Sequence, residues 1–159
     1  MGILYYLTFA SAIGSGLLAG IFFAFSTFVM TALSRLPAEQ SISAMQTINT
    51  DIVRSLFIAV FMGATVLSVI LGIASFFKIG SPSSAYVLAG SVLLFVGAFL
   101  VTVVFNVPLN DTLAVADPRS PNGARAWQDY LNGWMPWNHV RTLTSIAALV
   151  CFIVAIRKW

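Results

Sequence analysis

The amino-acid sequence predicts an all-α integral membrane protein, a four-helix bundle with a long aromatic-rich connection between the third and fourth helices. Two observations predict this class. Apolar residues make up 59% of the 159 residues and charged residues only 8%, so a water-soluble globule would have too little polar surface to cover itself. Four segments are also apolar over lengths near the ~20 residues that a helix needs to cross a bilayer. We therefore expect one domain, residues 1–159.

Three of the predicted helices cover residues 3–33, 55–77 and 84–106, and none of them contains Asp, Glu, Lys or Arg. The fourth is shorter, because its uncharged run covers only residues 143–156. To cross the bilayer it must begin near Trp137 and cover about 137–156. This extension brings Asn138, His139 and Arg141 into its first turns, where ionisable groups are costly unless they face protein or water. The alternative is a polar helix end that reaches the interface.

Composition excludes several other classes. The net charge of +3 comes from scattered basic residues, so no nucleic-acid partner is expected. Cys151 is the only cysteine and His139 the only histidine, so neither an intrachain disulfide nor a histidine-rich metal site is predicted. Four spans place both termini on one side of the membrane. The terminal side carries three Lys and Arg and the other side five, and the counts tie at three each if Arg54 and Arg141 are bound inside a site. We expect cytoplasmic termini in a bacterial inner membrane.

The third connection, residues 107–136, is the longest predicted non-membrane segment. About 30 residues without apolar runs are usually either functional or disordered. The aromatic residues Trp127, Tyr130, Trp134 and Trp137 argue against disorder, because side chains of this kind pack or sit at the interface. Residues 122–131 could form a short helix with Trp127 and Tyr130 on one face. We expect a lid or interfacial helix over the mouth of the bundle.

Helix contacts are predicted from glycine spacing in the first helix. Gly16 and Gly20 form a GxxxG pattern, which permits close approach of another helix. That partner could be a helix of the same chain or of a second copy, so the pattern also permits a homo-oligomer.

Polar residues gather where the third helix ends and the fourth begins. Asn106 and Asn110 are four apart and would share a helix face, although Pro108 predicts a kink or a helix end between them. The sequence alone leaves two interpretations, a plain helix stop or a polar pocket at membrane depth. If the two helices are neighbours, one level of the bundle holds Asn106, Asn110, Asn138, His139, Arg141 and Thr142.

These residue types suit acid–base chemistry on an anion. His139 has the pKa range of a general base near neutrality, Arg141 could hold an anion, and the amides could stabilise an oxyanion. The same set would equally serve a binding site. No phosphate-binding glycine loop, CxxC or GxSxG motif is present.

Three motifs then resemble a known family in their order and spacing. They are AGIFFAFSTFVM in the first helix, FNVPLND after the third and WNHVRT in the fourth. The chain resembles the anthrone oxygenase-like family of small four-helix membrane proteins. The resemblance implies oxidation of planar phenolic anthrones to anthraquinones with O2 and without a cofactor. The matching positions are Asn106, Pro108, Asn110, Trp134, Asn138, His139, Arg141 and Thr142.

The resemblance suggests roles for these residues. His139 would take a proton from the substrate, Arg141 with Asn106 and Asn110 would stabilise the resulting anion, and Trp134 with Trp137 would stack on the flat rings. The expected partners are a small hydrophobic aromatic substrate, O2 and membrane lipid. The expected substrate-binding residues are Trp127, Tyr130, Trp134, Trp137, Asn138 and Thr142.

Two other functions remain open from the sequence. One is a non-catalytic membrane protein, either an accessory subunit or a lipophile-binding protein, in which the polar residues only hold helices together. A transporter is the other, although four helices without an inverted repeat offer little for alternating access. The discriminating feature is the interior. A structural role predicts a filled site with a fully hydrogen-bonded Arg141, whereas an enzyme needs a cavity of several hundred cubic ångströms for an aromatic substrate.

Overall fold

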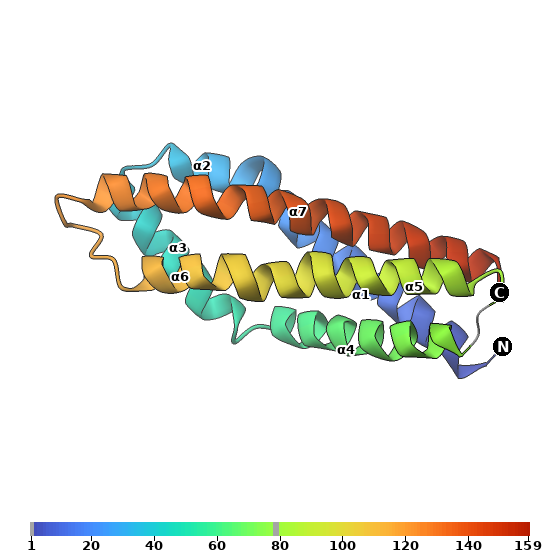
Figure 1. Ribbon diagram of the computed structural model, residues 1–159. Coiled ribbons are helices and arrows are strands. Elements are labelled where there is room, and N and C mark those ends of the chain that lie inside the picture. The colour runs from blue at the N-terminus through green and yellow to red at the C-terminus, as the bar shows by residue number, and fades with distance from the viewer. Residues whose placement is uncertain (1, 78–79) are drawn as a thin grey trace.

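The computed structural model describes residues 2–77 and 80–159, and these residues form a bundle of long helices (Figure 1). Four helical stretches are long and apolar enough to cross a membrane. They are Ile3–Ser34, Leu56–Phe76, Ser84–Ala114 and Gly123–Arg157. Both chain ends lie at the same end of the bundle (Figure 1), as four crossings require. The predicted all-α membrane bundle is therefore confirmed.

In the first and third of these stretches, α-helical turns alternate with wider π-helical turns. The first span joins α1 (Ile3–Ala24), the π-helical η1 (Phe25–Val29) and α2 (Met30–Ser34). A shorter helix, α3 (Ala38–Ile52), leads to the second span, α4 (Leu56–Phe76). The third span joins α5 (Ser84–Val92), η2 (Leu93–Leu100), η3 (Thr102–Asn106) and α6 (Val107–Ala114), and α7 (Gly123–Arg157) is the fourth.

The bundle extends beyond the bilayer at one end. From Trp137 to Arg157 α7 rises about 30 Å, which is the thickness of the hydrocarbon layer. We call the part beyond this level the cap, made of α2, α3, α6 and the first turns of α7. All five acidic residues lie on the cap or on the segment joining α6 to α7. The cap has its own buried core of Met30, Ile42, Met45, Leu113, Trp127, Tyr130 and Trp134.

Close helix contacts involve the third and fourth spans rather than the GxxxG pattern of the first. A Cβ on Gly97 would lie 2.5 Å from the Thr144 side chain, and one on Gly90 would lie 2.9 Å from the Phe152 ring. By contrast, a Cβ on Gly20 would meet nothing within 4 Å, and one on Gly16 would meet a leucine side chain at 3.7 Å. The tightest of these contacts are thus at Gly90 of α5 and Gly97 of η2, and in the first span it is Gly14 that packs closely, since a Cβ there would lie 3.1 Å from Ala64 Cβ.

The connection between the third and fourth spans differs from the prediction. Helical structure continues through Pro108 to Ala114, and α7 begins at Gly123 rather than near Trp137. Only residues 115–122 lie between the two helices. The π-helical turn of η3 directly before Pro108 accommodates the missing backbone donor, and Pro136 is contained within α7. The aromatic residues therefore lie on the extended fourth helix, not on a separate lid.

The predicted turn at residues 78–83 lies partly outside the described residues, which exclude Lys78 and Ile79. Gly80 has a φ of 102°. This left-handed conformation favours glycine, because in other residues the Cβ atom would clash with the neighbouring backbone. The glycine thus explains how the chain reverses between α4 and α5.

Candidate functional site

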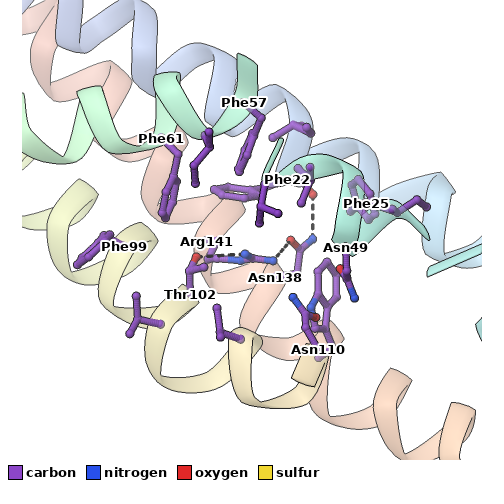
Figure 2. A pocket seen from close by; sticks show the side chains of 18 of the residues that line it. Phe22, Phe25, Asn49, Phe57, Phe61, Phe99, Thr102, Asn110, Asn138 and Arg141 are labelled. Atoms are coloured by element: carbon purple, nitrogen blue, oxygen red, sulfur yellow. Dashed lines mark hydrogen bonds between the residues drawn. The ribbon is translucent and has the colours of Figure 1, made fainter. Parts of the chain in front are cut away.

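A cavity of about 290 Å³ lies where the cap meets the membrane-embedded part of the bundle. Its walls come from α1, η1, α3, α4, α6, α7 and the π-helical turns of the third span. Six aromatic side chains line it: Phe22, Phe25, Phe57, Phe61, Phe99 and Trp134. Its polar lining is Asn49, Thr102, Asn110, Asn138 and Arg141 (Figure 2). The site is thus mostly apolar with a few polar groups, as small-molecule sites usually are.

Arg141 is the only ionisable side chain among the described residues that line the cavity. It is 5% exposed. Its Nη1 donates to Thr102 Oγ1 at 3.1 Å and its Nη2 to Asn138 Oδ1 at 2.8 Å, while its Nε makes no hydrogen bond. The guanidinium carbon lies 4.4 Å from the centre of the Phe22 ring and 5.0 Å from that of Trp134. These aromatic faces stabilise the cation in part.

The charge of Arg141 has no carboxylate partner within residues 2–77 and 80–159. The two ion pairs found there join Arg119 to Glu39 and Arg125 to Asp129, and all four side chains are exposed. Arg141 lies one helical turn inside the level of Trp137, where an unpaired charge is expensive. A buried guanidinium without a carboxylate partner, on a residue that lines a cavity, is a natural binding group for an anion.

Asn138 fixes the position of Arg141. It is fully buried, and its Nδ2 donates to the Phe22 carbonyl at 2.9 Å and to Ser26 Oγ at 2.8 Å. Its Oδ1 accepts from Arg141. Because both ends of the amide are engaged, Asn138 cannot turn away without leaving buried polar groups unpaired. The first span therefore holds the Arg141 guanidinium in place through Asn138 of α7.

A second polar group lies on the other side of Asn138 from the guanidinium (Figure 2). Asn110 Oδ1 accepts a hydrogen bond of 2.9 Å from the Tyr130 hydroxyl. Asn49 lies beside the same hydroxyl, and its buried Nδ2 makes no hydrogen bond. The cavity lining therefore carries two amides, Asn49 and Asn110, in addition to Asn138 and the guanidinium.

The remaining amide predicted for the site, Asn106, does not line the cavity. It is fully buried and its Nδ2 donates to the Trp134 carbonyl at 3.2 Å, so it joins the third span to α7. Its Oδ1 is buried without a hydrogen bond. Of the two asparagines predicted from the end of the third helix, Asn106 and Asn110, the structure thus brings only Asn110 to the cavity wall.

His139 also lies outside the cavity lining. Its side chain is exposed on the surface of α7, with Nδ1 3.0 Å from Ser26 Oγ. Thr142 is buried behind the wall, where its Oγ1 donates to the Asn138 carbonyl at 2.9 Å and lies 2.9 Å from the same Ser26 oxygen. His139 is therefore linked to Arg141 only through Ser26 and Asn138.

Of the four predicted aromatic residues, only Trp134 lines the cavity. Trp137 stacks on Phe105 with ring centres 3.6 Å apart, away from the cavity lining. Trp127 and Tyr130 stack on each other at 5.6 Å within the core of the cap. These residues support the site from outside and do not form its walls.

Helix α3 and its contribution to the site were not predicted from the sequence. Met45, Asn49 and Ile52 line the cavity from this helix. The signal was present, because Ile42, Met45, Asn49 and Ile52 recur at a helical spacing that marks one face. Pro37 directly before the helix also suits a helix start.

The described residues contain no group of three or more His, Cys, Asp or Glu side chains that could hold a metal ion. The fold and the cavity define a small four-helix membrane protein with an unpaired guanidinium in an aromatic site. The model of the anthrone oxygenase family matches residues 53–151, and the chain belongs to this family. No curated protein and no solved structure gives a significant match.

Proposed function

We propose that this protein is a cofactor-independent monooxygenase that oxidises a planar phenolic or anthrone-type substrate with O2. One observation carries the proposal, the unpaired Arg141 guanidinium in an aromatic cavity. Family membership supports the same reaction class. An anthrone reacts with O2 through its anion, and this cavity combines a fixed positive charge with flat apolar walls. The anion would be stabilised where its negative charge develops.

The reaction balances without an external reductant. The substrate CH2 group loses one proton, and the resulting anion passes an electron to O2. Combination of the two radicals forms a carbon–oxygen bond and a peroxide anion. Loss of the second hydrogen from that carbon breaks the O–O bond, leaving a carbonyl group and hydroxide. Hydroxide takes up the first proton as water, so one substrate and one O2 give one quinone and one water.

The sequence-based role of His139 as the base is not part of this proposal. The cavity lining contains no imidazole and no carboxylate among the described residues, and His139 is exposed on α7. We assign the ionisation instead to the electrostatic effect of Arg141, which favours the anionic form of a bound acid. The released proton passes to water at the membrane interface.

The size and shape of the cavity limit the substrate. Its volume of about 290 Å³ is at the lower end of the range for small-molecule sites, roughly 300–1,000 Å³. A single flat molecule of about three fused rings suits this space and its aromatic walls. The polar residues of the lining, Arg141 with Asn49 and Asn110, suit oxygen atoms carried by the ring system.

One observation also favours a lipophile-binding protein without catalysis. The lining has a binding group for an anion but no side chain that commonly donates or accepts protons near neutrality. Such a protein would bind the same planar phenols and leave them unchanged. The two functions therefore differ in turnover and not in binding.

The test is oxygen uptake by the purified protein in lipid nanodiscs supplied with emodin anthrone, with quinone formation followed by absorbance. Protein-free nanodiscs measure spontaneous oxidation. We expect Arg141→Gln to lose about 100-fold or more of the enzymatic rate, and Arg141→Lys to keep part of it, because a lysine retains the charge but not the planar donors. Arg157→Gln, at the far end of the same helix, is the matched control.

Three outcomes are informative. Uptake above the blank that is lost in Arg141→Gln and kept in Arg157→Gln supports the oxygenase. Binding of the substrate without oxygen uptake supports the lipophile-binding protein. Full activity of Arg141→Gln, with helix content unchanged by circular dichroism, removes the role assigned to the guanidinium.

A further inference from the structure

Exposure divides the residues that line the cavity into walls and rim. Four of them are exposed, Val53, Met62, Val103 and Val107, with 39% to 57% of their surface accessible. The lining residues of α1, η1 and α7 are all buried or half-buried. The mouth of the cavity therefore lies between the α3–α4 corner on one side and η3 with the start of α6 on the other.

Helix packing explains why an opening occurs at this place. The second span, α4, packs on α1, α5 and η2, whereas η3 and α6 pack on each other and on α7. Close contact between the second and third spans thus ends where η3 begins. The short helix α3 contacts α4, α6 and α7 and closes the cavity toward the cap. The side of the bundle stays open.

The chemistry of the rim matches lipid rather than water. All four rim residues are apolar, and three of them belong to membrane-spanning stretches. Beside the rim, Leu56 and Val104 are also exposed and apolar. At its cap side, Val53 is followed by the exposed Arg54, which suits the headgroup layer. The mouth faces the bilayer near the boundary between acyl chains and headgroups.

We propose that the ligand enters the cavity sideways from the bilayer, through the opening bounded by Val53, Met62, Val103 and Val107. The identity of the ligand rests on the proposed function, and its class becomes more specific. It is a planar phenol dissolved in the membrane at headgroup level, which passes the apolar rim and places its acidic edge at Arg141. An aqueous substrate with charged substituents would not cross this rim.

The test uses binding kinetics, so it does not depend on turnover. The probe is 1,8-dihydroxyanthraquinone, preloaded in protein-free vesicles and mixed with the protein in proteoliposomes, and quenching of tryptophan fluorescence reports uptake. Val103→Phe and Val53→Phe place a ring on opposite sides of the rim. Val104→Phe is the matched control, because Val104 is equally exposed and adjacent but does not line the cavity.

We expect both rim variants to slow association and dissociation about tenfold or more, with little change in their ratio, whereas Val104→Phe binds like the wild type. The rate should also follow the mole fraction of probe in the lipid and not its bulk concentration. Equal rates in all variants, or no uptake of the probe by the wild type, would overturn the proposal. Slowed binding in a protein that consumes no oxygen would support the lateral opening and refute the oxygenase.

Discussion

Gly97 is the position where a single methyl group should disturb the protein most. A Cβ there would lie 2.5 Å from both Cβ and Cγ2 of Thr144, whereas carbon atoms in contact normally lie about 3.5–4.0 Å apart. Because the Thr144 Cβ is attached directly to the α7 backbone, a change of side-chain rotamer cannot relieve the overlap. In Gly97→Ala, η2 and α7 must therefore separate by about 1 Å.

The expected cost follows from this separation. Overpacking of this kind destabilises proteins by about 1–3 kcal/mol, and replacing a helical glycine by alanine offsets about 0.5–1 kcal/mol. We expect Gly97→Ala to lose about 1–2 kcal/mol of unfolding free energy. Thr144 lies one turn after Arg141, so the guanidinium moves with it. A displacement of 1 Å at a reacting site can cost about 100-fold in rate.

The assay is reversible unfolding in mixed detergent micelles, followed by tryptophan fluorescence and combined with oxygen uptake. Gly63→Ala is the matched control, because a Cβ on this glycine of α4 meets nothing within 4 Å. In the double variant Gly97→Ala with Thr144→Gly, the removed Thr144 side chain leaves room for the new methyl group, so most of the lost unfolding free energy should be recovered. If Gly97→Ala is as stable as Gly63→Ala, the close packing of η2 on α7 is not what holds these helices.

Two further variants test other parts of the structure. His139→Ala should keep most of the oxygen uptake and an unchanged pH profile, because its side chain lies outside the cavity; loss of the activity would restore His139 as the base. Gln46→Leu should lower the unfolding free energy by about 1 kcal/mol, because Gln46 Nε2 donates to the Leu113 and Ala116 carbonyls at 2.9 Å each. The control is Gln128→Leu, because Gln128 is an exposed residue of α7. If both variants change the unfolding free energy equally, the Gln46 hydrogen bonds do not stabilise the packing of α3 on α6.

The membrane spans could be predicted from sequence because hydrocarbon thickness sets a minimum apolar length. The predicted start at Trp137 was wrong as a helix boundary, because α7 begins at Gly123. Apolarity reports where a helix meets lipid and not where its hydrogen bonds begin. The turns before Trp137 are stabilised by the buried Trp127 and Trp134, which the sequence analysis interpreted as part of a connection.

The site could be predicted only in part, because helix periodicity fixes faces within a helix and not the rotation of one helix against another. Asn138 and Arg141 were expected together, and their spacing brings them into one hydrogen bond. His139 is adjacent to Asn138 in sequence, and the 100° step between neighbours turns it to the outer surface. Asn49 was missed because its helix lies far from the motif in the sequence.

The length of α7 has a consequence for the membrane in which the protein works. Its 35 residues form a rod of about 52 Å, of which only about 30 Å matches the hydrocarbon layer. The stacked Trp137 and Phe105 anchor this rod at the interface, so a bilayer of different thickness must deform or tilt the helix. If the ligand enters by the proposed lateral opening, membrane thickness sets whether that opening meets acyl chains or headgroups, and lipid chain length should change the rate of ligand binding.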